Sequence, residues 1–176
     1  GNPFLLISDT AWDLFSATSL SDGEFYLNNR QKKKFNTIFA MLVQKNNTIG
    51  IEPFINGDLT KPNDAYFDRI KNYISHASSI GLTMALNIIF YSAYKDEIRL
   101  MDEDQCKTLG RYIGDKFKNF NNIIWVAGGD FNAREARDKE RIRWLAGGVA
   151  EKSTDIIWTY FCSVAHSCRK IKLMGN

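Results

Sequence analysis

The sequence contains little cysteine and little histidine, and both scarcities exclude classes of site. Its 176 residues include three cysteines, Cys106, Cys162 and Cys168, and two histidines. No two cysteines form a CxxC pair, so the spacing indicates neither a disulfide framework nor a zinc site. Two histidines are also few for a metal-dependent amidohydrolase barrel. We therefore expect no metal and no cofactor.

The chain also lacks a strong charge of one sign and a long apolar run. It carries 23 basic and 20 acidic residues, and its densest basic run, Gln31 to Lys34, falls at the end of a predicted helix, where cations favour the helix dipole. We expect no nucleic-acid partner. No run reaches the roughly 18 apolar residues of a membrane span, and the chain opens without a charged and apolar leader.

Strand-like and helix-like segments alternate along the chain, as they do in a parallel sheet built from βα units. With 44% hydrophobic residues, the chain is expected to form one core and a single domain over 1–176. The predicted strands are 4–7, 35–43, 82–89, 122–127 and 155–162. The predicted helices are 21–34, 64–80, 102–120 and 135–153.

Local signals support several of these boundaries. Ser21 with Glu24 has the spacing of a capping box at a helix start, and Gly81 stands where an αL residue ends the helix over 64–80. The segment 44–63 is longer than most connections in a compact domain, which is typical of a functional loop.

Polar and aromatic residues follow the predicted strands. Asp9 and Trp12 follow the first strand, Asn87 lies near the end of the third, and Asp130 and Asn132 follow the fourth. Parallel α/β folds bind ligands at the carboxyl ends of their strands, so we expect these residues to face one cleft. Carboxylates, amides and aromatic rings suit a carbohydrate. No glycine-rich phosphate motif follows any strand.

Five segments together resemble the apiosidase-like glycoside hydrolases: "ISDTAWDLF", "NNRQKKKFNTI", "FINGDLTKPNDAYFDRI", "GLTMALNIIF" and "LGRYIGDKFKNFNNIIWVAGGDFN". The resemblance implies a TIM-barrel glycosidase that acts on plant cell-wall pectin or related glycans and is secreted or periplasmic. It implies that Asp130 is the general acid/base and that the block containing Asp9 and Trp12 forms part of the sugar pocket. Ser8 stands where the family usually has glycine.

The chain is short for this fold, because a (β/α)₈ barrel needs about 250 residues. We expect a partial barrel of about four βα units plus a fifth strand, with the second catalytic carboxylate outside this chain. The first and fifth strands would then present unpaired edges, which favour self-association.

Other interpretations remain open. Asp130 could be a helix N-cap, Asp9 a cap or a buried hydrogen-bond anchor, and Trp12 a core residue, while Trp125 is assigned to the core. The chain could be a carbohydrate-binding remnant without catalysis, or a doubly wound α/β domain that binds a small ligand. A barrel places its strands consecutively, whereas a doubly wound sheet reverses direction at a switch point.

Overall fold

The computed structural model describes residues 5–129, 136–153 and 158–160, and its framework is one parallel sheet. The strands are β1 (Ser8–Thr10), β2 (Thr37–Met41), β3 (Thr83–Asn87), β4 (Ile123–Ala127) and β5 (Trp158–Tyr160). They lie side by side in sequence order. This consecutive order is that of a barrel and excludes the doubly wound alternative. The fold is a partial (β/α) barrel, as predicted.

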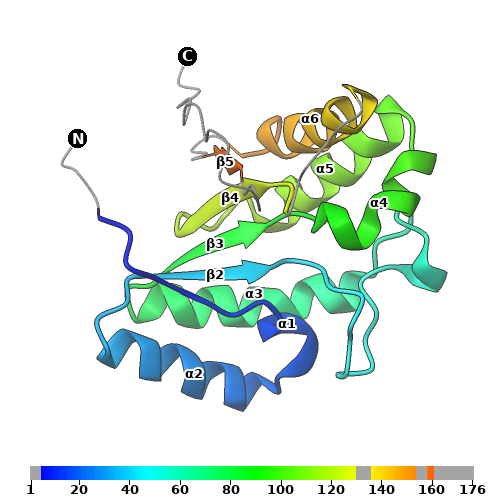
Figure 1. Ribbon diagram of the computed structural model, residues 1–176. Coiled ribbons are helices and arrows are strands. Elements are labelled where there is room, and N and C mark those ends of the chain that lie inside the picture. The colour runs from blue at the N-terminus through cyan, green and yellow to red at the C-terminus, as the bar shows by residue number, and fades with distance from the viewer. Residues whose placement is uncertain (1–4, 130–135, 154–157, 161–176) are drawn as a thin grey trace.

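Helices connect the strands in the expected alternation. The elements are α1 (Leu14–Ala17), α2 (Leu20–Lys32), the 3₁₀ turn η1 (Ile55–Gly57), α3 (Asp64–Ser79), α4 (Tyr91–Leu100), α5 (Glu103–Phe117) and α6 (Ala136–Ala150). Figure 1 shows α2 and α3 on one side of the strands, with α5 and α6 continuing the helical layer around them. The loop before α3 and the short helix α4 both lie at the end toward which β2 and β3 point (Figure 1).

The two faces of the sheet bury different side chains, because successive residues of a strand point to opposite faces. Residues paired in register across parallel strands share a face. The face toward the helices belongs to the main core and includes Ile38, Met84 and Trp125. The opposite face carries a small separate cluster of Phe39, Ala85, Ile124 and Val126. This second face is the interior of the partial barrel.

Several predicted boundaries require correction. The first strand, β1, lies later in the chain than the predicted strand over 4–7. Its pairing with β2 begins only at Ser8, and the apolar residues 5–7 before it are exposed to solvent. Helix α2 begins at Leu20 with Ser19 as its N-cap, whose hydroxyl accepts from Asp22 N–H at 3.1 Å, so the predicted Ser21 cap is wrong. Helices α1 and α4 were not predicted, although Tyr91, Tyr94 and Ile98 have helical spacing.

The end of α3 confirms a sequence signal. The helix stops at Ser79, and Gly81 has φ +77°, in the left-handed region that favours glycine. Helix α5 likewise begins after Asp102, which forms a complete capping box with Gln105.

Helices α5 and α6 pack with their backbones in close approach. A Cβ built on Gly110 would lie 2.1 Å from the carbonyl oxygen of Leu145, and one on Gly148 would lie 2.3 Å from that of Lys107. Because the atoms in the way are backbone, no side chain can rotate to make room. The neighbouring Gly147 has no such contact within 4 Å.

An ion pair joins α4 to α6. The Asp138 carboxylate, only 2% exposed, accepts from Arg99 Nε at 3.0 Å and from an Arg99 terminal nitrogen at 2.7 Å. This bidentate hydrogen bonding is the main cause that holds the pKa of Asp138 below its ordinary value.

Replacing Asp138 with asparagine is expected to lower the free energy of unfolding by about 2 kcal/mol at pH 7, because Arg99 loses its anionic partner. Since the folded-state pKa of Asp138 is depressed, its contribution is complete above the unfolded pKa of about 4 and disappears as pH falls through the folded pKa. Urea unfolding at several pH values should therefore show the two proteins converging in acid. Asp96→Asn, on the exposed side of α4, is the control. A difference that persists unchanged at low pH would contradict this account.

Candidate active site at the carboxyl ends of the strands

Three aromatic rings from separate segments meet above the barrel interior. The ring centroids of Trp12, which follows β1, and Phe39, on β2, are 4.9 Å apart in an edge-on arrangement. The Trp12 ring is also 5.9 Å from Phe90, which follows β3. We call these three residues the aromatic rim cluster. All three are partly exposed, so ring surface remains available to a ligand. Of the three, only Trp12 was named as a site residue from the sequence. Phe90 directly follows the predicted third strand, and that position was the signal that could have indicated it.

Asn87 ends β3 on the same interior face as Phe39. It is fully buried, and its side-chain Nδ2 donates to the carbonyl oxygen of Gly128. Its other side-chain atom, Oδ1, is buried without a hydrogen-bond partner among the described residues. Asn87 therefore ties the end of β3 to the chain that leaves β4.

The two glycines after β4 have distinct structural roles. Gly128 has a backbone φ of +72°, a conformation that residues with a side chain rarely adopt. A Cβ on Gly129 would lie 2.3 Å from the Phe90 ring and 2.7 Å from Asn87 Nδ2. Packing within the protein therefore explains why Gly129 carries no side chain.

Asp9 lies on the other face of the sheet. It is in register with Ile38, which faces the helices, whereas Asn87 is in register with Met41 and Val126. The expectation that Asp9 and Asn87 face one cleft is therefore wrong.

The partners of Asp9 come from α2. Its carboxylate forms an ion pair with Arg30 Nε and accepts from the Tyr26 hydroxyl at 2.9 Å. Burial is the largest cause that raises the pKa of the Tyr26 phenol, and its hydrogen bond to Asp9 adds to it. This geometry matches the hydrogen-bond anchor that the sequence left open. Contact of Asp9 with a sugar stays a prediction.

A further polar pair lies at the start of the rim. Gln44 Nε2 donates to Asp13 Oδ1 at 3.1 Å and so joins the segment after β2 to the segment after β1. Asp13 is exposed. Asp13 was not predicted as a site residue, although its position directly after Trp12 in the sequence could have indicated it.

The remaining predicted residues divide into two groups. Asp130 and Asn132 lie outside the described residues. Trp125 is buried and packs its ring 6.2 Å from that of Phe117, which confirms its assignment to the core.

Among residues 5–129, 136–153 and 158–160, no group of three histidine, cysteine or acidic side chains is placed to hold a metal ion. No helix in the same part is long and apolar enough to cross a membrane.

A family model described as "Apiosidase-like, catalytic domain" matches residues 1–172. Comparison with curated proteins found no match.

Several solved structures with a similar fold are glycoside hydrolases. One described as a glycoside hydrolase has a TM-score of 0.79 at 23% identity, and the alignment covers 91% of this chain and 37% of that chain. A family 5 glycoside hydrolase from Bacteroides vulgatus has a TM-score of 0.78 at 22% identity, covering 90% and 35%. Cel5A of Thermotoga maritima, solved with cellobiose, has a TM-score of 0.64 at 13% identity, covering 87% and 50%. The chain thus spans little more than a third of the first two.

Proposed function

Because the chain belongs to the apiosidase-like catalytic domain family, we propose that its parent protein hydrolyses glycosidic bonds in pectic or related plant glycans. The observation that supports this most directly is the aromatic rim cluster at the carboxyl ends of the strands, which is where barrel enzymes carry their active sites. Partly exposed rings there offer stacking surface to sugars.

Asp130 is the proposed general acid/base. Glycoside hydrolysis needs one carboxyl group to protonate the leaving oxygen and a second to act as nucleophile or as base for water. Asp130 follows β4 directly after Gly128 and Gly129, and its pKa must be raised above about 4 for it to donate a proton near neutral pH. We propose that the second carboxylate belongs to later βα units of the parent.

The other site residues receive different proposed roles. Trp12 is proposed to stack against a sugar ring, and Asn132 to hydrogen-bond a hydroxyl. Asn87 supports the site by holding Gly128, since its amide is buried. Asp9 is proposed to fix the position of β1 from the helix-facing side of the sheet, through its contacts with Arg30 and Tyr26 of α2.

The test is hydrolysis of pectic side-chain oligosaccharides by the intact parent, followed as released sugar. Turnover that is lost in Asp130→Asn supports the proposal. Binding without turnover by the parent would favour a carbohydrate-binding remnant instead. Rapid turnover by the 176-residue chain alone would overturn the placement of the second carboxylate.

Secretion to the periplasm or the medium is proposed on the same ground, because a polysaccharide substrate lies outside the cell. Fractionation of cells that express the parent gene tests this. Activity confined to the cytosolic fraction would contradict it.

We also propose that the isolated chain self-associates through the segment before β1. In the described residues β1 ends the sheet, and the apolar side chains next to it are open to solvent: Leu5 is 76% exposed, Leu6 51% and Ile7 47%. Unpaired strand edges and exposed apolar groups both favour association.

Sedimentation velocity is expected to show concentration-dependent oligomers that Leu6→Lys reduces. Phe25→Lys provides the control, because Phe25 is an apolar residue that is 74% exposed, against 51% for Leu6, but lies on α2. A monomer at all concentrations, or equal effects of the two variants, would argue against this edge.

A further inference from the structure

Three side chains join helix α4 to helix α6. The Asp138 carboxylate of α6 accepts from Nε and from a terminal nitrogen of Arg99 on α4, at 3.0 and 2.7 Å. Arg141, further along α6, donates from Nε to the Met101 carbonyl at 3.1 Å and from a terminal nitrogen to the Arg99 carbonyl at 2.9 Å. Carbonyl groups at a helix end lack partners within the helix, so Arg141 also caps the end of α4. We call Arg99, Asp138 and Arg141 the α4–α6 clamp.

The clamp fixes geometry as well as distance. Asp138 is only 2% exposed, and a guanidinium that donates two hydrogen bonds to one carboxylate sets the relative orientation of the two helices. Burial raises the pKa of the Tyr91 phenol to about 12, and its hydrogen bond with Asp138 adds to the rise. Tyr91 is the first residue of α4. Asp138 therefore bonds to side chains from both ends of this helix.

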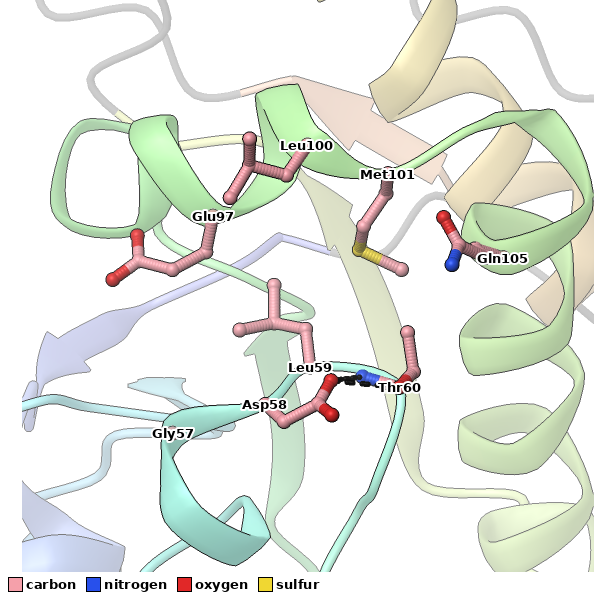
Figure 2. Close-up of a pocket in the computed structure, with 8 residues that line it drawn as sticks. All are labelled: Gly57, Asp58, Leu59, Thr60, Glu97, Leu100, Met101 and Gln105. Carbon is pink, nitrogen blue, oxygen red and sulfur yellow. Dashed lines mark hydrogen bonds between the residues drawn. The ribbon is translucent and has the colours of Figure 1, made fainter.

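The end of α4 is held less firmly on its other side. There a pocket of about 360 Å³ separates α4 from the loop before α3. Figure 2 shows Leu100 and Met101 on the α4 side of this pocket and Leu59 on the loop side. The ion pair of Lys45 with Glu97 also reaches α4, but its lysine side chain is 48% exposed, and exposed pairs contribute little. The clamp is therefore the stronger polar constraint on this helix.

From α4 the constraint extends to the active-site end of the barrel. Helix α4 begins directly after Phe90, a member of the aromatic rim cluster whose ring centroid is 5.9 Å from that of Trp12. The Phe90 ring also packs against Gly129, where an added Cβ would lie 2.3 Å from it. Asp130 follows Gly129 in the sequence, and α6 is the next helix. The clamp thus joins the helix that places Phe90 against Gly129 to the helix that follows Asp130.

Resting on the proposed glycosidase function, we propose that Arg99, Asp138 and Arg141 are positioning residues for the general acid. They act through Phe90 and Gly129 and need no contact with the substrate. Proton donation depends on the exact placement of the acid, and a displacement of about 1 Å can cost about 10²-fold in rate. Loss of the clamp should therefore have its largest effect where the leaving group needs a proton.

The test compares two substrates of the intact parent. One is pectic side-chain oligosaccharides, whose leaving groups need protonation, and the other is the dinitrophenyl glycoside of the sugar that they release. We expect Asp138→Asn to lower kcat/KM, which reports the steps up to bond breaking, about tenfold or more on the oligosaccharides and less than about threefold on the dinitrophenyl glycoside. A role in stability alone would lower the folded fraction and so reduce both values by the same factor.

Glu151→Gln is the matched control on the same helix. Glu151 also pairs with an arginine through two hydrogen bonds, from Arg111 of α5 at 2.6 and 3.3 Å, but both side chains are at least 40% exposed. Because this pair lies at the surface and joins α6 to α5, its loss should leave both kcat/KM values unchanged within about twofold.

Two further variants guard against loss of the fold. Arg141→Met leaves the pair of Arg99 with Asp138 intact and removes only the cap on α4, so it should show the same selectivity between substrates with a smaller loss. Arg99→Lys keeps the cation but not the paired geometry, so its oligosaccharide activity should lie between those of the unsubstituted parent and Asp138→Asn.

A double-mutant cycle determines whether the clamp acts through Asp130. Added to Asp130→Asn, Asp138→Asn should lower kcat/KM on the oligosaccharides by less than about twofold, because the proton donor is already absent. A loss as large as in the unsubstituted parent would overturn the proposal.

The same measurements separate the clamp from the proposed function. Selectivity between the two substrates in Asp130→Asn, without selectivity in Asp138→Asn and Arg141→Met, would overturn the clamp and leave the glycosidase standing. A parent that cleaves neither substrate would overturn the proposed function and, with it, the role of the clamp in catalysis.

Discussion

Gly148→Ala and Gly147→Ala are expected to change stability in opposite directions, with a gap of about 3 kcal/mol between these neighbouring substitutions. A methyl group at Gly148 would lie 2.3 Å from the Lys107 carbonyl oxygen and 2.9 Å from the Arg111 amide nitrogen. Helices α5 and α6 would have to separate along their shared interface. At Gly147 the space is open, so alanine there gains helix propensity of up to about 1 kcal/mol.

Urea unfolding measures this gap: the midpoint concentrations of the two variants are compared, provided that the dependence of the unfolding free energy on urea is the same for both. Gly110→Ala tests the same interface from α5, where the nearest atom is the Leu145 carbonyl oxygen at 2.1 Å. It should resemble Gly148→Ala. Equal midpoints for Gly147→Ala and Gly148→Ala would mean that the close approach of the helices contributes nothing to stability.

The second large effect concerns catalysis by the intact parent. Asp130→Asn is expected to reduce the rate on a glycoside with a poor leaving group by about 10²-fold or more, the usual scale of general acid catalysis. Asparagine has nearly the same shape as aspartate but cannot supply the proton. An activated aryl glycoside, whose leaving group needs little protonation, should lose far less in the bond-breaking step.

Asp13→Asn is the matched control for this experiment. Asp13 is a carboxylate of the same rim whose described partner is Gln44, so its loss should have a small effect on both substrates. Thermal unfolding of each variant shows whether the fold is retained. If Asp130→Asn lost equal activity on the two substrates, Asp130 would bind sugar or support structure rather than donate the proton.

The order of the elements was predictable because its signals are local. Alternating strand and helix patterns depend on neighbours a few residues apart. They placed four of the five strands and the four long helices α2, α3, α5 and α6, while the first strand was predicted at 4–7, directly before β1. The position of Gly81 ended α3 correctly. The N-cap of α2 was predicted at Ser21 but is Ser19, because a serine at either position can cap a helix and only the position of the first turn decides.

The face to which Asp9 points was not predictable. A strand that reads Ser-Asp-Thr has no apolar alternation, so its pattern does not show which residue faces the helices. The register with β2 decides it, by pairing Asp9 with Ile38. The contacts with Tyr26 and Arg30 then follow from the packing of α2.

The sequence by itself determined the α/β class and the order of the βα units, which depend on periodicity and chain connectivity. The barrel type was implied by the resemblance to a family, and the strand order of the structure decided it. Only the tertiary structure decided that Asn87 holds Gly128, that Gly129 packs against Phe90, and that Gly110 and Gly148 let two helices touch. Each of these is a contact between segments distant in the chain, and its existence depends on register and helix approach, which no local pattern specifies.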